Sequence, residues 1–478
     1  MRSGRDTRST RRPTVALALP ALLAAALLQL AAEAAPQNGQ KGSGGAAVAH
    51  RAGGKIVKAP NAPDGRIYKV ADRAIEPTIG ITKKGDIFYT AASGITGVDV
   101  VRSTDDGRTW ENTSPRSPAG TKTHPITLDP YVYVDESTGR IFNIDLYVAC
   151  SNLSFSDDNG ETWTTNPLAC GRPVNDHQTL FSGPPALSPT TVFPEIVYYC
   201  WNDFGAGSSC SKSLDGGVTW TPTGSPAFTG YDPNGEGQGG NFCGGFHGHG
   251  VVGEDGTVYL PKEYCGQPWL GISKDEGATW TRVQVADNTT ERLGSDTSVA
   301  VDRKGNLYYA YETQNQKLFL VTSTDGGERW SKPMMAGAPR VKEVTLPTLD
   351  AGDPGKVAIA YMGSENSRFA RCKPDCTDAD YDGVKWNGYI TMTANALSDD
   401  PLFYSGTVNA RPDPLYIGRC DFSNRCPPIL DFIDVEIAPD GTPWGAFVDP
   451  CGPVCATNGA NDGSLAVIGR LVGGPGLR

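Results

Sequence analysis

Side chains able to transfer protons gather at a few places in the sequence. His247 and His249 are separated by one residue, so both imidazoles would face the same side of an extended strand. His177 stands at the start of another strand-like run, next to Asp176. Histidines and carboxyl groups placed in this way can serve as general acids, general bases or nucleophiles. The candidate catalytic residues are His177, His247, His249, Asp176, Glu263 and Tyr264.

A second set of carboxylates could hold a cation. Each member precedes or begins a strand-like run, and the members are Glu76, Asp129, Asp296 and Asp431. Carboxylates close together cannot all stay ionised without a counter-charge, so either a cation binds or several pKa values rise. Oxygen ligands favour calcium, whereas engagement of the three histidines would favour zinc. We expect a divalent cation at these residues, calcium in preference to zinc.

A structural role is the alternative for every one of these side chains. A carboxylate at the start of a strand can accept hydrogen bonds from backbone N–H groups that lack a partner in the sheet. The choice between the two roles therefore depends on the elements that position the residues.

Five copies of one eight-residue pattern supply the scaffold. Each copy has Ser, Asp, Gly and Trp at fixed places, and the copies begin 53, 57, 60 and 50 residues apart at Ser103, Ser156, Ser213, Ser273 and Ser323. The pattern predicts a hairpin turn in which Ser and Asp bond the local backbone, Gly provides positive φ and Trp packs on the next strand. We therefore assign a structural role to Asp105, Asp158, Asp215, Asp275 and Asp325.

A second repeat is a pair of strands around a Gly turn, and it occurs seven times. The pairs span residues 76–89, 129–147, 177–201, 247–264, 296–311, 346–361 and 431–448. Together with the hairpins they predict an all-β fold of seven blades, each with four antiparallel strands around a central channel. Six blades are the alternative. A strand over residues 66–70 would close the ring by pairing with residues 465–471.

The five hairpins match the Asp-box, or BNR repeat, and over roughly residues 66–471 the chain resembles sialidase-like secreted β-propellers. In sialidases, three arginines bind the substrate carboxylate, and an Asp and a Tyr/Glu pair cleave the bond. Arg73 lies near the position of the first arginine, but the acidic Glu76 follows it. The other positions offer histidines and Asp296 where arginines are wanted. The candidate substrate-binding residues are Arg73, Glu312 and Glu365.

Three functions are consistent with histidines and carboxylates at the mouth of the central channel. The first is an enzyme acting on extracellular glycans, either a glycosidase or a polysaccharide lyase. The second is a non-catalytic propeller that binds a glycan or a protein and holds a structural cation. The third is an exo-sialidase with relocated arginines. We favour the first.

The ends and the cysteines indicate export. Arginines precede an apolar run over residues 15–32, which is typical of a cleaved signal peptide at 1–34. The composition predicts a flexible lead-in over residues 35–65 and one propeller domain over residues 66–478.

The twelve cysteines form pairs of near neighbours. This predicts local disulfides 150/170, 200/210, 243/265, 372/376, 420/426 and 451/455, with a structural zinc site as the alternative. The net charge of −11 gives no support for a nucleic-acid partner. We expect a secreted monomer that binds carbohydrate and has no membrane span after signal cleavage.

Overall fold

The computed structural model describes residues 40–92, 98–116, 129–147, 150–167, 176–189, 192–202, 207–230, 245–287, 297–313, 315–372, 375–420, 426–451 and 464–478. The chain divides into two units, residues 1–38 and 39–478, and every described residue belongs to the second. The predicted signal peptide therefore lies outside the described residues. No helix in the described part of the chain is long and apolar enough to cross a membrane.

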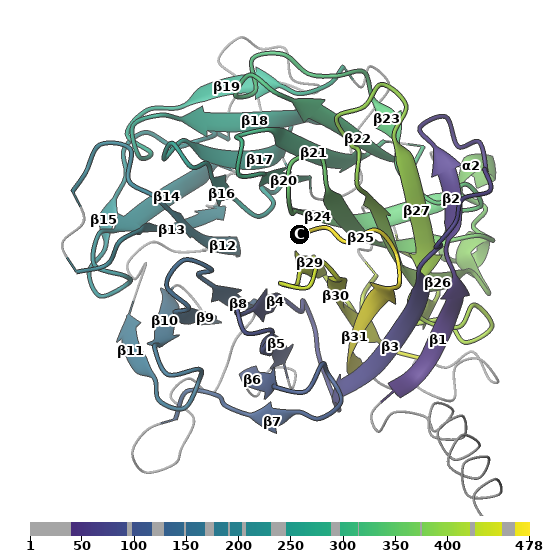
Figure 1. Ribbon diagram of the computed structural model, residues 1–478, viewed down its shortest axis with the longest axis horizontal. Coiled ribbons are helices and arrows are strands. Elements are labelled where there is room, and N and C mark those ends of the chain that lie inside the picture. Colours follow the sequence, from purple (N-terminus) through teal and green to yellow (C-terminus); the bar gives the residue numbers. More distant parts are fainter. Residues whose placement is uncertain are drawn as a thin grey trace, which may run out of the picture. The chain divides into compact units, whose positions relative to one another are not determined.

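The second unit is a seven-bladed β-propeller, as the sequence predicts, with seven antiparallel sheets arranged around a central axis (Figure 1). The first five blades each have four strands that follow chain order from the axis outward. Blade 1 holds β4 (Ile79–Ile81), β5 (Ile87–Ala92), β6 (Val98–Ser103) and β7 (Glu111–Asn112). Blade 2 holds β8 (Pro130–Val134), β9 (Ile141–Tyr147), β10 (Cys150–Ser156) and β11 (Thr164–Pro167). Blade 3 holds β12 (Asp176–Gly183), β13 (Ile196–Asn202), β14 (Ser208–Ser213) and β15 (Thr221–Pro222).

Blades 4 and 5 repeat the same order. Blade 4 holds β16 (Val251–Val252), β17 (Val258–Tyr264), β18 (Gln267–Ser273) and β19 (Thr281–Gln284). Blade 5 holds β20 (Ser298–Val301), β21 (Leu307–Glu312), β22 (Leu318–Ser323) and β23 (Met334–Met335). The blades pack on one another through buried apolar and aromatic side chains.

The last two blades each gain a fifth strand from the start of the described chain. Blade 6 holds β24 (Glu343–Ala351), β25 (Val357–Ser364), β26 (Lys385–Thr393) and β27 (Leu402–Thr407), with β2 (Val48–Arg51) outside them and β28 (Tyr416–Ile417) paired to β26. Blade 7 holds β29 (Asp434–Ile437), β30 (Pro443–Asp449), β31 (Leu465–Val472), β3 (Asp64–Ala71) and β1 (Gln40–Ala46). The antiparallel pairing of β3 with β31 confirms the predicted closure of the ring.

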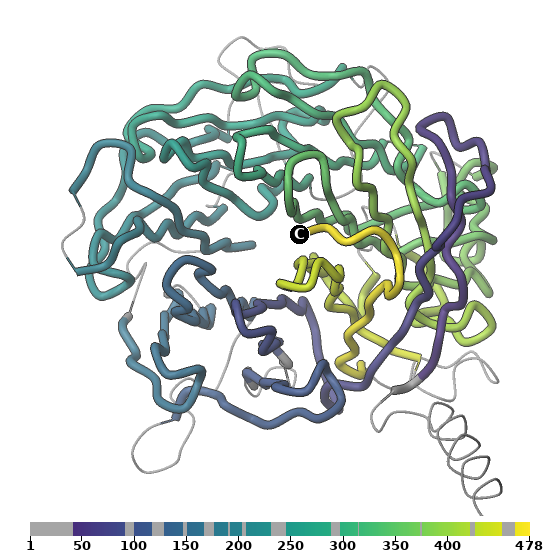
Figure 2. The backbone as a smooth tube through the Cα atoms, in the orientation of Figure 1, coloured from purple at the N-terminus to yellow at the C-terminus, as the bar shows by residue number. Residues whose placement is uncertain are grey.

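Residues 40–51 differ from the flexible lead-in that their composition predicts. They form β1 and β2, which run along the outer edges of two blades, as the tube in Figure 2 shows. His50 is fully buried, stacks on Phe403 and places its Nε2 2.8 Å from the Ser405 hydroxyl. Gly44 is needed for close approach, because a Cβ there would lie 1.6 Å from the Thr407 carbonyl oxygen. The glycines that suggest flexibility thus permit tight packing.

The five repeated hairpins share a Gly N–H bond to the Ser hydroxyl and a backbone N–H bond to the Asp carboxylate. In the third, the Ser213 hydroxyl accepts a bond from Gly217 N at 2.8 Å, and the Asp215 carboxylate accepts bonds from the Thr219 N–H and hydroxyl at 2.8 and 2.7 Å. The Trp220 indole N–H donates to the Gly217 carbonyl at 3.0 Å. Each of these Asp side chains is therefore engaged by its own turn.

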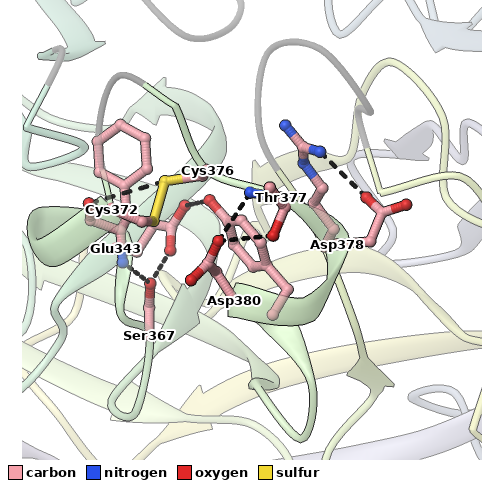
Figure 3. The surroundings of a disulfide bond; sticks show 10 residues. Glu343, Ser367, Cys372, Cys376, Thr377, Asp378 and Asp380 are labelled. Atoms are coloured by element: carbon pink, nitrogen blue, oxygen red, sulfur yellow. Dashed lines mark hydrogen bonds and ion pairs between the residues drawn. A yellow bond between two sulfur atoms is a disulfide. The ribbon is translucent and has the colours of Figure 1, made fainter.

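Three of the predicted disulfides are present, Cys200–Cys210, Cys372–Cys376 and Cys420–Cys426. Each of the other three predicted pairs includes a residue outside the described ranges. The Cys372–Cys376 bridge joins the end of α2 (Phe369–Cys372) to the segment just before the 3₁₀ turn η2 (Asp378–Tyr381), in the connection between β25 and β26 (Figure 3). Glu343 is fully buried beneath this connection and accepts bonds from the Ser367 and Tyr381 hydroxyls, so a β24 carboxylate anchors the connection.

Candidate functional site

Polar side chains on or just before the inner strands bind backbone N–H groups of neighbouring blades. Asp129 accepts from His177 N at 3.2 Å, and Glu76 accepts from Asp431 N at 3.1 Å. Asp434 accepts from Ile79 N at 3.1 Å. Inner strands have no sheet partner on the axial side, so their free donors need acceptors of this kind. The structural alternative raised for these carboxylates thus has direct support in their contacts.

One end of the channel, which we call the histidine end, contains Glu76, Asp129, His177 and Phe432. Glu76 and His177 have left-handed φ values of 46° and 49°, which non-glycine residues rarely adopt. Burial and the neighbouring carboxyl groups of Asp129 and Asp431 raise the pKa of Glu76 well above its usual range. Burial also raises the pKa of Asp129, to about 6, against the opposing hydrogen bond with Glu76 and the charge of His177.

The predicted cation ligands are only partly brought together. Glu76, Asp129 and Asp431 are neighbours at the histidine end, and Asp296 lies outside the described residues. Within those residues, no group of three or more His, Cys, Asp or Glu side chains is arranged to hold a metal ion. The cation stays a prediction from the sequence.

The three predicted histidines have different surroundings. His177 stacks on Phe246 at 5.3 Å and meets Phe432 edge-on at 5.2 Å. His247 is fully buried, and burial and the charge of Lys262 lower its pKa well below the usual value. His249 lies edge-on to Tyr131 and places its Nδ1 3.5 Å from the Asp434 carboxylate. His177 and His249 border a pocket of 20 Å³, which has room for about one water molecule.

The remaining predicted site residues do not line the central cavity described next. Asp176 is half-buried in β12, whereas Glu263 and Tyr264 are buried at the end of β17. Arg73 is exposed and pairs through its backbone with Ser464. Glu312 is buried at the end of β21. Glu365 accepts a bond from the Tyr389 hydroxyl at 2.9 Å and lies 3.1 Å from the Arg411 guanidinium.

A cavity of 660 Å³ occupies the channel on the other side of His249. Tyr131, Tyr133 and Phe181 form aromatic parts of its wall. It extends to the turns that follow the inner strands, at Lys83 and Arg303. Strands alternate in direction within each blade, so these turns share a face with the five repeated hairpins. We call this the cavity end, and it lies opposite the face on which the sequence places chemistry.

Two carboxyl groups in the cavity wall have shifted pKa values. Burial, together with the nearby charges of Asp350 and Glu136, raises the pKa of Glu436 well above its usual range. Burial raises the pKa of Asp350 to about 6, and the positive charge of Arg478 opposes that rise. Burial thus raises the pKa of both carboxyl groups toward the range in which a carboxyl group can act as a general acid or base.

Sequence reasoning missed both residues of this pair. Glu436 stands two residues after Asp434 on β29, so both side chains face the channel. Asp350 lies near the end of β24, within a run of buried residues. The sequence feature that could have identified them is an acidic residue within a strand, on a face where the residues are normally apolar.

No family model matches the sequence. A xyloglucanase from Paenibacillus is 25% identical over 266 residues, covering 49% of this chain and 23% of that enzyme, so the match spans less than a quarter of its length.

Several solved propellers resemble the chain in fold. The Hadza microbial sialidase Hz136 aligns over 61% of this chain and 63% of its own, with 20% identity and a TM-score of 0.39. The NanB sialidase of Streptococcus pneumoniae aligns over 84% and 68%, with 14% identity and a TM-score of 0.41. A six-bladed fucose-recognising lectin from Aleuria aurantia aligns over 67% and 93%, with 9% identity and a TM-score of 0.42. These likenesses concern the fold alone.

Proposed function

We propose that the protein is a secreted glycoside hydrolase whose site is the central cavity, with Glu436 as general acid and Asp350 as general base or nucleophile. The observation that carries the proposal is the pair of carboxyl groups with raised pKa values in the wall of the 660 Å³ cavity. Glycosidic bonds are cleaved by such pairs. The sequence match to a xyloglucanase supports action on a glycan.

Each carboxyl group has a definite task in this reaction. Glu436 gives its proton to the glycosidic oxygen as the bond to the anomeric carbon breaks. Asp350 either takes a proton from the attacking water or attacks the anomeric carbon itself, and water then releases the sugar. The backbone N–H groups of Ala351 and Ile437 bind the two Asp350 oxygens at 2.7 and 2.8 Å and hold the carboxylate in place.

The lining favours a glycan without negative charge. Carboxyl groups outnumber cationic groups around the cavity, and Arg478 is already engaged by Glu136. An anionic sugar would therefore meet repulsion, which argues against a sialidase or a uronate lyase. Aromatic walls and spaced polar groups in a cavity of this volume suit a small ligand, such as the end of a neutral glycan chain.

Release of aryl groups from neutral, uronic and sialylated glycosides tests the proposal. We expect turnover of a neutral glycoside, and a loss of about 100-fold or more in both Glu436→Gln and Asp350→Asn. Glu254→Gln is the matched control, because Glu254 is an exposed carboxylate that borders the same cavity. Glycan binding without turnover by the unaltered protein would instead identify a carbohydrate-binding propeller. Turnover of sialosides alone would contradict the electrostatic argument.

A further inference from the structure

Three side chains from three blades close the inner end of the cavity, and we call them the floor: Tyr131 on β8, His249 just before β16 and Asp434 at the start of β29. The His249 ring stands edge-on to Tyr131, with the ring centroids 5.1 Å apart, and its Nδ1 lies 3.5 Å from Asp434 Oδ1. Phe432 also meets the His249 ring edge-on, at 5.8 Å. The imidazole is therefore held by two aromatic rings and a carboxylate.

Hydrogen bonds to other strands hold the rest of the floor in place. Asp434 Oδ2 accepts from Ile79 N at 3.1 Å, and Asp434 Oδ1 accepts from Val435 N at 2.8 Å. The Tyr131 hydroxyl lies 3.3 Å from the Thr179 hydroxyl of blade 3. Side chains fixed in this way are already ordered, so little further ordering is needed when a ligand binds.

His249 separates two spaces of very different size. On one side is the 660 Å³ cavity, and on the other is the 20 Å³ pocket at the histidine end. That pocket has room for about one water molecule, so in the described part of the channel a sugar unit that enters the cavity stops at the floor. The side chains of His249 and Asp434 are 18% and 11% exposed, which leaves part of each accessible from the cavity.

The carboxyl pair of the proposed site lies farther toward the mouth of the cavity than the floor does. Glu436 follows Asp434 by two residues on β29, so both face the cavity and lie about 7 Å apart along the strand. Their carboxylates accept from Ile81 N and Ile79 N, which repeats the same two-residue step on the neighbouring β4. This spacing suits one sugar unit between the floor and the carboxyl pair, with the rest of a glycan toward the mouth.

We propose that the floor makes the enzyme exo-acting, with His249 and Asp434 as specificity-determining residues that bind hydroxyl groups of the terminal sugar. This inference rests on the proposed function and names its substrate class, the non-reducing end of a neutral glycan. The sugar on the floor is the one whose anomeric carbon faces the carboxyl pair, so the glycan is shortened from that end. A terminal sugar without the contacted hydroxyl is rejected, because polar groups of the floor would then be left unpaired.

The products formed from reduced gluco-, galacto- and manno-oligosaccharides test the exo action. We expect single sugars to be released stepwise from the non-reducing end. A 4,6-benzylidene acetal on the terminal unit should slow cleavage about 100-fold or more, because the blocked hydroxyls no longer reach the floor. Release of internal fragments, or equal rates on blocked and unblocked substrates, would overturn the proposal.

His249→Ala tests the floor itself. We expect KM for the aryl glycoside to rise about tenfold or more with a smaller change in kcat, because a hydrogen bond to the sugar is lost. The preference for this glycoside over its deoxy analogues should fall as well. Glu254→Gln, at the exposed turn after β16, should leave both quantities unchanged. His249→Asn serves where His249→Ala does not accumulate. Unchanged KM and unchanged preference would show that His249 only packs, which would overturn the proposal.

A binding measurement separates this inference from the proposed function. If no glycoside is turned over, the proposed function fails, and isothermal titration calorimetry with glucose, galactose, mannose and xylose still tests the floor. Binding that is lost in His249→Ala and kept in Glu254→Gln supports the floor as the sugar contact. Binding that His249→Ala does not weaken, or no binding of any of the four sugars, overturns it.

Discussion

The two ends of the channel use the same kinds of side chain for different purposes. At the histidine end, Glu76 and Asp129 are 2% and 8% exposed and bind the backbone of neighbouring blades. At the cavity end, Glu436 and Asp350 make similar backbone bonds but also face a space of 660 Å³. The residue types are alike at both ends, although Glu76 and Asp129 precede their strands and Glu436 and Asp350 lie within theirs. An adjoining open cavity is what distinguishes them, and it arises only when the blades assemble.

The largest expected contrast is in turnover. Glu436→Gln should lower kcat/KM by about 100-fold or more, because the amide cannot donate a proton as the acid does. Glu76→Gln should leave kcat/KM within about threefold, since its side chain is not part of the cavity wall. Steady-state assays on one neutral glycoside compare the two variants. If Glu76→Gln lowered kcat/KM more than Glu436→Gln, the catalytic site would lie at the histidine end instead.

The next contrast is in stability. Asp129→Ala removes the acceptor of the buried His177 N–H and should lower the free energy of unfolding by about 1–3 kcal/mol. Urea unfolding at pH 7 measures the loss, and Asp157→Ala, which removes a carboxylate that is 62% exposed, is the control with a smaller effect. If Asp129→Ala lowers the free energy of unfolding no more than Asp157→Ala does, the structural role of Asp129 is contradicted.

The pH dependence of the free energy of unfolding tests the contribution of Asp350. Its pKa is raised in the folded state to about 6, so its stabilising contribution is greatest at low pH and is lost as the pH rises through 6. Asp350→Asn should therefore flatten the decline in unfolding free energy between pH 4 and 6. Denaturation series at several pH values check this, and an unchanged slope would mean that Asp350 is not the group responsible.

The smallest expected effect concerns the cation predicted at the histidine end. If Glu76, Asp129 and Asp431 bind calcium, its removal by a chelator should lower Tm by a few degrees. Elemental analysis of the purified protein establishes the metal content directly. Metal-free protein whose Tm ignores both chelator and added calcium would leave the carboxyl groups neutralised by protons alone.

The repeats made the fold predictable, whereas the site was much less so. Local turn chemistry at Ser213, Asp215 and Gly217 recurs at regular spacing, so the blades and the β3–β31 closure follow from short segments. The raised pKa values of Asp350 and Glu436 depend on the assembly of two blades, and no local pattern contains them. The prediction of a flexible lead-in was wrong because a Gly-rich composition is the same in a flexible segment and in a strand packed against a blade edge. Gly44 is an example of the second case.

The closure between β3 and β31 also sets the order in which the chain can mature. Tyr68 pairs with Ile468, so blade 7 stays incomplete until residues 400 positions apart have met. Contacts of such long range make folding slow, and the unpaired edges exposed meanwhile invite association with other chains. An expression tag or truncation that disturbs either partner strand should therefore reduce the yield of soluble protein before it affects any property of the finished ring.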